Sequence, residues 1–488
     1  MTMAFKIDAA LLKDLDNPPV ELLKDLMNKQ DSRVARFDKL DNYYLGKHAI
    51  MDRTLSSNQA HDNRVMVNYA KYVTDMVVGM MTGRPITYVA QDGGPVDPIT
   101  RAFTRMDIAA HDTDLEHDLS CYGVAYEMLY LHVVDATTTE ERIATLDPRR
   151  TFVVTDDSED ENYLFGVYWV PKFKLNGTED GALVSVYTPH SLIQYRTVSG
   201  HIVDGSNNAE GYPRYSSHYW GSEPITEVLN NRQQQGDYEQ LISQIDAYNS
   251  LQSDRITDKD NFVDAILLAY GTAIEGNLAK RKMLDDLPAK DEGTSIEWLT
   301  KTLDESQQQV LADSITADIH EMSNVPNMND ENFAGNVSGE AMKYKLFALL
   351  NLISSKEPLL KKAIRRRLEL MQNMLNLKEQ NVDVTDIKIQ FTLNIPINMS
   401  DVITNIKNAD GIIPRLISYG WLPDDYDPKK LVELMKEQTA DQIKTQKEAM
   451  GGEPQAPDTD NDEQEGFRDD QGKGDRDQDV RKSANGDD

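Results

Sequence analysis

Cysteine is almost absent from this sequence, and long apolar runs are missing. Cys121 is the single cysteine among 488 residues, which excludes a disulfide within the chain and a metal site built from several cysteines. No apolar run approaches the ~18–20 residues that span a bilayer. The first residues mix Lys and Asp with apolar side chains, unlike a signal peptide. We therefore expect a protein without membrane contact that is made and kept in a reducing cytoplasm.

Positive charge is also scarce. The chain has 51 Lys and Arg residues against 82 Asp and Glu residues, a formal net charge of −31. A conventional grip on nucleic acid needs a basic patch that replaces counterions, so this balance argues against such a grip. It does not exclude contact with a nucleic acid that must slide. The length suggests about three domains, and the composition is that of a soluble protein with a substantial core.

One stretch, from Thr302 to Met342, has no Lys or Arg at all. A uniformly negative surface suits the passage of a polyanion, because like charges repel through thin layers of solvent. The acidic residues of this stretch are Asp304, Glu305, Asp313, Asp318, Glu321, Asp330, Glu331 and Glu340.

Motifs of known enzymes are missing as well. The chain has no phosphate-binding GxxxxGK[ST], no GxSxG, no HExxH and no GxGxxG. Its many carboxylates allow a metal-dependent nuclease pair, but no spacing selects one. We therefore predict no catalytic residues, and we keep a DNA-acting nuclease as an alternative.

Two weak metal patterns are present. His111, His117 and Cys121 lie within eleven residues, but offsets of six and four do not put all three on one helical face, so ordinary helix residues are the favoured interpretation. Asp458, Asp460 and Asp462 resemble the start of a calcium loop. Glu463 stands where that loop needs Gly, and Asp469 where it needs Glu, which favours a solvated acidic tail. No metal site and no cofactor are predicted.

The pattern of the chain predicts an α+β protein. Residues 8 to about 80 have helical periodicity, broken at Pro18-Pro19, and residues 98–122 favour another helix. A short strand is expected at Ile86–Ala90. From Ala125 to about His218, runs rich in Tyr, Val and Phe alternate with turns, which indicates strands and hairpins.

Two long helices are predicted to bracket a small insert, Asp258–Lys301, with strand candidates AILLA and SIEWLT. The first helix is Asp237–Thr257, in which Asp237 can act as the N-cap. The second follows a capping box of Thr302 and Glu305. Their apolar stripes are Leu241, Ile245, Tyr248 and Leu251 on the first, and Val310/Leu311, Ile315, Ile319 and Met322 on the second.

The chain then continues with a polar loop, a helix that runs to about Leu377, and a strand. Pro358 should kink or split this helix. Clean alternation over Asp386–Ile397 predicts a half-buried strand, expected to return to the β-rich region that starts at Ala125. Short helices follow over residues 400–447, and the chain from Glu448 onward is expected to be disordered.

A dense basic cluster interrupts the helix before Leu377. One interpretation is a solvated face whose charges pair with acidic side chains of a neighbouring element. The other is contact with phosphate or with the acidic surface of an adjoining subunit. The cluster consists of Lys361, Lys362, Arg365, Arg366 and Arg367.

Four ordered stretches carry a family resemblance over roughly residues 35–400. They are N42-Y-Y-L-G-K-H48 with Asn68-Tyr69-Ala70 and Gly83-Arg84-Pro85-Ile86; G123-V-A-Y-E127 with Leu146-Asp147-Pro148; G236-D-Y-E239 with I245-D-A-Y-N249 and Ser253-Asp254; and Val325-Pro326 with N336-V-S-G-E-A341 and Lys343-Tyr344-Lys345. With these residues the chain resembles the portal (head-to-tail connector) proteins of tailed double-stranded-DNA bacteriophages, of the kind found in long-tailed phages of Gram-positive hosts.

The resemblance implies a mostly helical α+β portal fold in a ring-shaped homo-oligomer, with a wing, a two-helix stem, a small α/β clip and a helical crown. It divides the chain into 1–63, the N-terminal helical part of the wing; 64–232, the α+β wing; 233–258, a stem helix; 259–301, the clip; 302–323, a stem helix; 324–337, a tunnel loop; 338–399, a long helix and the returning wing strand; 400–447, crown helices; and 448–488, an acidic tail of open role.

The function implied is a DNA channel at one capsid vertex, through which viral DNA is packaged and ejected. The partners implied are a ring of twelve subunits, double-stranded viral DNA that slides, the terminase large subunit, a head-completion or adaptor protein, and the scaffolding and major capsid proteins. The protein would reside in the virion, and in the host cytoplasm during assembly. An acidic cytoplasmic scaffold protein stays a further alternative.

Within that channel, the acids of the second stem helix are expected to face DNA and the loop after it to touch DNA weakly. The channel-lining candidates are Asp304, Glu305, Asp313, Asp318 and Glu321, and the loop candidates are Asn327, Asn329, Asp330, Asn332 and Asn336.

Overall fold

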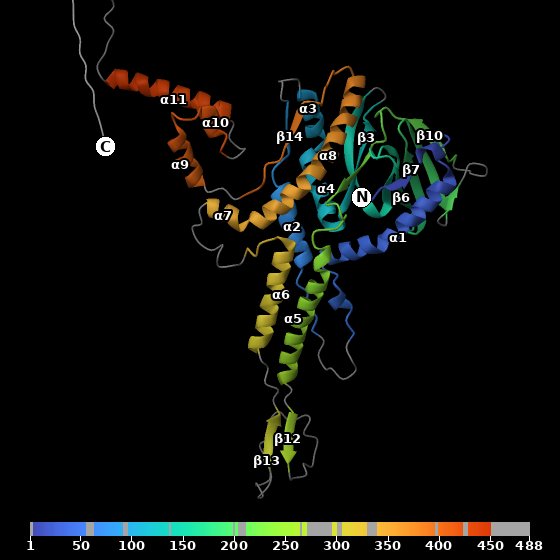
Figure 1. The fold of residues 1–488 in the computed structure, drawn as a ribbon, viewed down its shortest axis with the longest axis vertical. Coiled ribbons are helices and arrows are strands. Elements are labelled where there is room, and N and C mark those ends of the chain that lie inside the picture. The colour runs from blue at the N-terminus through green and yellow to red at the C-terminus, as the bar shows by residue number, and fades with distance from the viewer. Residues whose placement is uncertain are drawn as a thin grey trace, which may run out of the picture. The chain divides into compact units, whose positions relative to one another are not determined.

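A computed structural model describes residues 3–54, 63–90, 96–135, 138–198, 201–203, 211–263, 266–270, 295–299, 305–328, 339–395, 399–422 and 428–449. The chain forms two compact units, Met1–Asn398 and Met399–Asp488. Each unit is described by itself below, and Figure 1 shows their elements.

The first unit contains a seven-stranded sheet. Its strands are β1 (Phe5–Ile7), β5 (Thr151–Asp156), β6 (Tyr163–Phe173), β7 (Glu179–Tyr187), β8 (Ser191–Val198), β9 (His201–Val203) and β10 (Arg214–Ser217). The order is β1-β5-β6-β7-β8-β10, with β9 also paired to β8, and β1 alone runs parallel to its neighbour. Phe152, Val167 and Val186 form a core with Leu23 and Leu26 of helix α1 (Val20–Tyr44).

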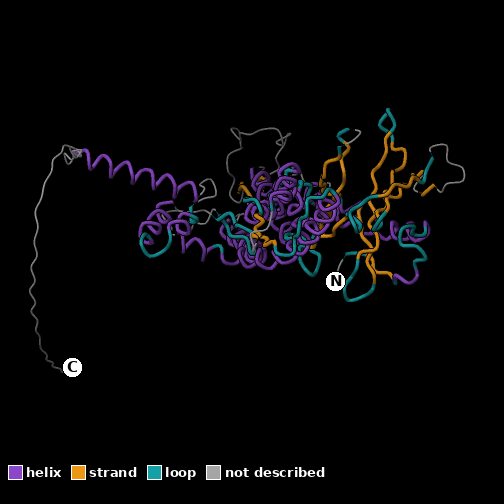
Figure 2. The backbone as a smooth tube through the Cα atoms, turned by 90° about the horizontal axis from the view of Figure 1, so that it is seen from above, coloured by secondary structure: helices purple, strands orange, loops and turns teal. Residues whose placement is uncertain are grey.

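A second sheet has three strands in the order β11-β3-β4, which are Ile225–Leu229, Val124–Val133 and Thr139–Leu146. Both pairs are antiparallel. The predicted β-rich region from Ala125 to about His218 is therefore confirmed. Figure 2 shows most of the strands gathered to one side of the central helices of this unit.

Helices form the rest of the body. They are α2 (Tyr69–Met81), α3 (Asp97–Met106), α4 (Ile108–Tyr122) and α8 (Phe347–Leu377), with the short α7 (Gly339–Lys345) and 3-10 turns at Ala9–Leu11, Ala49–Asp52, Pro148–Arg150 and Glu239–Leu241. The single helix predicted over 98–122 is wrong. Asp107 adopts a left-handed conformation (φ 52°), which ends α3 and starts α4 in a new direction.

Helix α8 is continuous through Pro358. Proline lacks the N–H that would bond to the carbonyl four residues earlier, so the ladder loses one bond there. Figure 1 shows the helix changing direction along its length, which agrees with a kink rather than a split. Leu360, Ile364, Leu368 and Met371 are buried on one stripe of this helix and join it to the main core.

The strand predicted over Asp386–Ile397 forms over a shorter range, as β14 (Ile387–Gln390). Ile387 and Ile389 are buried while Lys388 is exposed, as the alternation predicts. Its partner is the short strand β2 (Thr87–Ala90), not a strand after Ala125. Periodicity states which face of a strand is buried, but it contains nothing about the partner.

Two antiparallel helices project from the body in Figure 1. They are α5 (Ile242–Val263) and α6 (Glu305–Ser323), and beyond them lies an antiparallel pair, β12 (Ile266–Tyr270) and β13 (Ser295–Leu299). Helix α5 begins five residues later than predicted. Asp237 does not cap it, because its carboxylate accepts hydrogen bonds from Asn230 Nδ2 (2.9 Å) and Lys356 Nζ (2.9 Å).

The second unit contains three helices among its described residues, in the range where short helices are predicted. They are α9 (Met399–Ala409), α10 (Arg415–Tyr419) and α11 (Pro428–Ala449). The third has 22 residues, longer than predicted, and it includes Glu448 and Ala449, for which disorder is predicted. Ala409 and Ser418 are buried there, whereas Ile403, Leu416 and Ile443 are exposed. The acidic tail from residue 450 lies outside the described residues.

Candidate functional site

Helix α6 lies beside α5, and its buried side chains are small or β-branched. Ala312, Ile319 and Ser323 are buried, and Ile315 is half-buried. The base of α6 also meets helix α2, where the Tyr69 hydroxyl lies 3.5 Å from Thr316 Oγ1. Residues spaced by three, four and seven positions share one helical face, so the buried residues of α6 form a single stripe along it.

The apolar stripe predicted for α6 is partly wrong. Ile319 is buried, but Val310, Leu311 and Met322 are 70%, 51% and 60% exposed. The small side chains of Ala312 and Ser323 are buried instead. Leu311 instead shares the exposed face with Asp318, which follows it by seven residues, or about two turns.

The acidic candidates on α6 are exposed where the structure describes them. Asp313, Asp318 and Glu321 all face solvent, and Asp313 accepts a hydrogen bond from Gln309 (2.7 Å). Glu305 is exposed too, but its carboxylate lies 3.5 Å from Arg255 of α5, which offsets its charge. Asp304 lies outside the described residues. The exposed face of α6 therefore combines carboxylates with apolar side chains.

Of the loop candidates, only Asn327 is among the described residues, where it is half-buried. Asn329, Asp330, Asn332 and Asn336 lie outside them. The described part of the loop, 324–328, leaves the end of α6 and lies against helix α2, from which the Tyr72 hydroxyl donates a hydrogen bond to Pro326 O (2.8 Å). The start of this loop is thus attached to the body.

Helix α5 is attached to the body by a row of polar side chains that sequence reasoning missed. Asn249, Ser253 and Thr257 are buried at four-residue spacing, and residues 63–67, which belong to no helix or strand, run alongside. Four helical residues rise about 6 Å, and two residues of extended chain span about 6.6 Å. Successive side chains of the row can therefore bond alternate backbone amides of the neighbouring segment, one each. The bonds are Val67 N–H to Asn249 Oδ1 (2.9 Å), Val65 N–H to Ser253 Oγ (3.0 Å) and Asn63 N–H to Thr257 Oγ1 (3.3 Å).

A buried histidine extends this row. Asn249 Nδ2 donates to His48 Nδ1 (2.9 Å), and His48 Nε2 donates to Tyr43 O (2.9 Å). These partners assign the neutral tautomer with the proton on Nε2. The Tyr43 hydroxyl donates to both carboxylate oxygens of Asp246 (2.8 Å each), and burial followed by this contact raises the pKa of Tyr43 to about 12.

The five residues of the basic cluster do not share one surface. They occupy almost two turns of α8, so their side chains point in different directions. Lys361 pairs with Glu357, and Arg365 donates to the carbonyls of Val384 (2.8 Å) and Ile387 (2.9 Å). Lys362 is the exposed member. Arg366 and Arg367 are bound within the body.

Arg367 is fully buried, so its charge serves the interior of this chain. It contacts Asp112 (2.7 Å) and Glu127 (2.6 Å), which come from α4 and β3. Burial alone would raise the pKa of Glu127, but Arg367 and His111 outweigh burial and hold that pKa at about 2. A cation within the apolar stripe of Leu360, Ile364 and Leu368 is the sequence signal for this arrangement.

Lys356 forms a second buried ionic cluster. Its ammonium group lies 2.5 Å from Glu116 and 2.9 Å from Asp237, with only 3% of its side chain exposed. Burial favours the neutral amine, but Asp237 and Glu116 outweigh burial and raise the pKa of Lys356. Lys356 and Arg367 are eleven residues apart, or about three turns. One face of α8 therefore meets Asp112 and Glu116 of α4.

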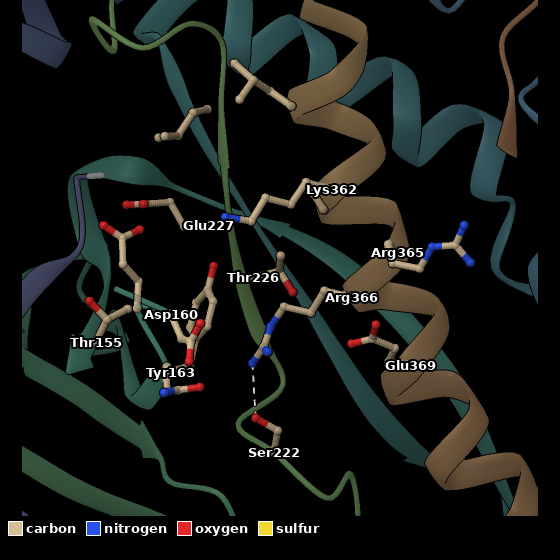
Figure 3. A pocket seen from close by; sticks show the side chains of 15 residues that line it. Thr155, Asp160, Tyr163, Ser222, Thr226, Glu227, Lys362, Arg365, Arg366 and Glu369 are labelled. Carbon is tan, nitrogen blue, oxygen red and sulfur yellow. Dashed lines mark hydrogen bonds between the residues drawn. The ribbon is translucent and has the colours of Figure 1, made fainter. Parts of the chain in front are cut away.

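A cavity of about 460 Å³ lies beside α8, between β11 and the turn that joins β5 to β6. Figure 3 shows Lys362 and Arg366 reaching into it from α8, whereas Arg365 points away. Arg366 pairs with Glu223 (2.5 Å) and lies 3.9 Å over the ring of Tyr163. Burial raises the pKa of Glu223 to about 7 despite this arginine.

The weak metal patterns find other partners. His111 Nε2 lies 3.1 Å from Glu127, while His117 lies 3.4 Å from Asp118 and 3.7 Å from the buried Cys121 Sγ. Among the described residues, no group of three His, Cys, Asp or Glu side chains could hold a metal ion. Asp458, Asp460 and Asp462 lie outside them. Within the same part of the chain, no helix has the length and apolar character to cross a membrane.

Comparison with known proteins gives one family. The family model described as "Phage portal protein, SPP1 Gp6-like" matches residues 23–447. No curated protein matches the chain. The matched range includes both helices of the projection, the helix α8, α9 and α10, and α11 as far as residue 447.

Proposed function

The chain belongs to the SPP1 Gp6-like family of phage portal proteins, and from this premise we propose that twelve copies form a ring in which α6 lines the DNA channel. As a portal protein it provides the passage for viral DNA at a capsid vertex, and it is the docking platform for terminase and head–tail adaptor proteins. The twelvefold number, the channel-lining residues and the identity of each partner are the proposal.

The observation that carries the proposal is the mixed exposed face of α6. Leu311 and Met322 lie eleven residues, or about three turns, apart on one face of α6 and are mostly exposed in a single subunit. Exposed apolar side chains on one face usually mark a contact with another protein. A neighbouring subunit in a ring would cover them. The same contact would turn the remaining part of the face, with Asp313 and Glu321, toward the axis.

An acidic lining suits a conduit through which DNA must slide. Phosphates and carboxylates repel across the few ångströms of solvent in a narrow channel, so DNA does not adhere. The loop from 324 to 337 would then supply weak contacts through Asn327 and the asparagines after it. ATP hydrolysis is assigned to a separate terminase large subunit, and this chain is proposed to be non-enzymatic.

Other parts of the chain are proposed to face the other partners. The pair β12–β13 and residues 259–301 would bind terminase during packaging and the adaptor protein afterwards. The seven-stranded sheet would face scaffolding and major capsid proteins, and the helices after Met399 would lie inside the capsid. Assembly is proposed to occur in the host cytoplasm.

The test replaces Asp313 and Glu321 together by Lys and measures the DNA packaged in a reconstituted system. Asp318 is left unchanged, because it shares a face with Leu311 and would lie at the subunit contact. We expect rings of unchanged thermal stability and a large loss of packaged DNA, because lysines at the channel surface bind phosphates. The matched control replaces the exposed acids Asp157 and Glu159 by Lys, which changes the total charge equally but outside the projection. Equal packaging by both double variants would overturn the channel-lining assignment.

A further inference from the structure

The point at which the loop leaves α6 is determined by named side chains. The helix ends at Ser323, and Asn324 takes a left-handed conformation (φ 59°), which an asparagine tolerates well at a helix end. Val325 then inserts into the core with no exposed surface. The chain therefore turns sharply and is anchored one residue later.

The next polar backbone groups are bound by side chains. Val325 N–H donates to Ser323 Oγ (3.2 Å), and His320 Nδ1 donates to Val325 O (2.9 Å). Backbone groups near a helix end need partners outside the helix, and here the helix's own last turn supplies two of them. The backbone at Val325 is thus held by α6 itself.

Tyr72 of α2 holds the following residues. Its hydroxyl donates to Pro326 O (2.8 Å) and accepts from Met328 N–H (3.3 Å), so both its donor and an acceptor position are used. The ring of Tyr72 packs edge-on to the ring of His320, with centroids 5.7 Å apart. The single hydroxyl of Tyr72 therefore attaches the residues before and after Asn327 to the body.

We infer that Tyr72 is a positioning residue that sets the direction in which the loop after Met328 leaves the body. The geometry carries this inference, because the two bonds constrain residues 326 and 328 relative to a rigid helix. That the loop acts on DNA rests on the proposed function above. In that setting Tyr72 would act through the loop without touching DNA.

A neighbouring tyrosine provides a matched control. Tyr69 also belongs to α2 and also packs edge-on to His320, with centroids 5.9 Å apart. Its hydroxyl faces Thr316 Oγ1, within α6, rather than the described residues 324–328 of the loop. Tyr69→Phe thus removes a similar hydroxyl at the same helix–helix contact and leaves the loop attachment intact.

The test is hydrogen exchange of the amides of residues 324, 325, 327 and 328 in the intact ring, compared among the unaltered protein, Y72F and Y69F. In the unaltered protein the Met328 amide should be protected from exchange. This measurement does not depend on the folding of any variant. Y72F should speed its exchange about twofold to tenfold, the effect of losing one net hydrogen bond, and Y69F should not. An unprotected Met328 amide in the unaltered ring, or equal exchange in Y72F and Y69F, would overturn the inference.

A second measurement separates this inference from the proposed function. Packaged DNA is compared among Y72F, Y69F and a variant with Asn332→Ala and Asn336→Ala. Loss of packaging in Y72F and in the asparagine variant, but not in Y69F, supports both ideas. If the asparagine variant packages normally, the proposed loop–DNA contact fails while the exchange result still decides the role of Tyr72.

Discussion

The body around α8 and the projecting helix α6 place ionised side chains in opposite environments. In the body, Arg367 and Lys356 have almost no exposed surface, and each contacts two carboxylates. On α6, Asp313 and Asp318 face solvent. Burying an ion pair costs desolvation free energy, and the pair offsets this cost only when both partners are correctly placed. The buried charges of the body therefore favour one arrangement of the elements that carry them. The exposed charges of α6 specify the field that a neighbouring molecule meets.

The largest effect should come from removing a buried charge. Arg367→Ala leaves Asp112 and Glu127 buried without their cation, which should lower the free energy of unfolding by about 3–5 kcal/mol. Urea denaturation followed by circular dichroism measures it. Lys362→Ala, five residues earlier and exposed, should change the same quantity by less than about 0.5 kcal/mol. Similar losses in the two variants would contradict the contrast between buried and exposed charge.

An intermediate loss of folding stability is expected where the projection joins the body. Asn249→Ala removes the acceptor for Val67 N–H and the donor to the buried His48. Leaving such groups unpaired costs about 1–3 kcal/mol, seen as a lower urea midpoint. Ser250→Ala, one residue along and off the polar row, is the control and should change little. An unaltered midpoint in Asn249→Ala would mean that water replaces this attachment without loss.

The smallest effect concerns pH. The pKa of Glu223 is about 7 in the folded protein against an ordinary value of 4.5, so the folded state holds a proton that the unfolded chain releases. Between about pH 4.5 and 7, stability should therefore fall as pH rises. Glu223→Gln should flatten this slope in urea titrations at several pH values. The control is Glu127, whose pKa of about 2 predicts the opposite trend, a loss of stability as pH falls below 4.5. If Glu223→Gln leaves the slope of stability against pH unchanged, Glu223 is not the group that holds the proton in the folded state.

The two carboxylates show why burial alone does not set a charge state. Glu127 receives three contacts from Arg367 and one from His111. Glu223 receives Arg366 and Ser222 on one oxygen, while its Oε1 has no hydrogen-bond partner among the described residues. Glu127 therefore stays ionised through the charge of Arg367 together with the hydrogen bonds that both of its oxygens accept, whereas the donors to Glu223 reach one oxygen.

Sequence reasoning succeeded where a local pattern has one structural meaning. The alternation around Ile387 and Ile389 predicted a strand with one buried face. Pro18-Pro19 predicted a break in the helical region, and α1 begins directly after it at Val20. It failed on α6, because Leu311 and Ala312 are adjacent and only the approach of α5 decides which one is buried. It also missed Tyr72 and Asn249, whose partners lie 256 and 182 residues away.

The sequence by itself determined the local elements, the acidic balance, the basic-free stretch and the membership of a portal family, because each depends on composition, period or ordered motifs. Only the tertiary structure decided that β14 pairs with β2, that Arg367 is an interior cation, and that the basic-free helix exposes Leu311 beside Asp318. These outcomes depend on which surfaces approach each other, and a periodic pattern contains no information about its partner.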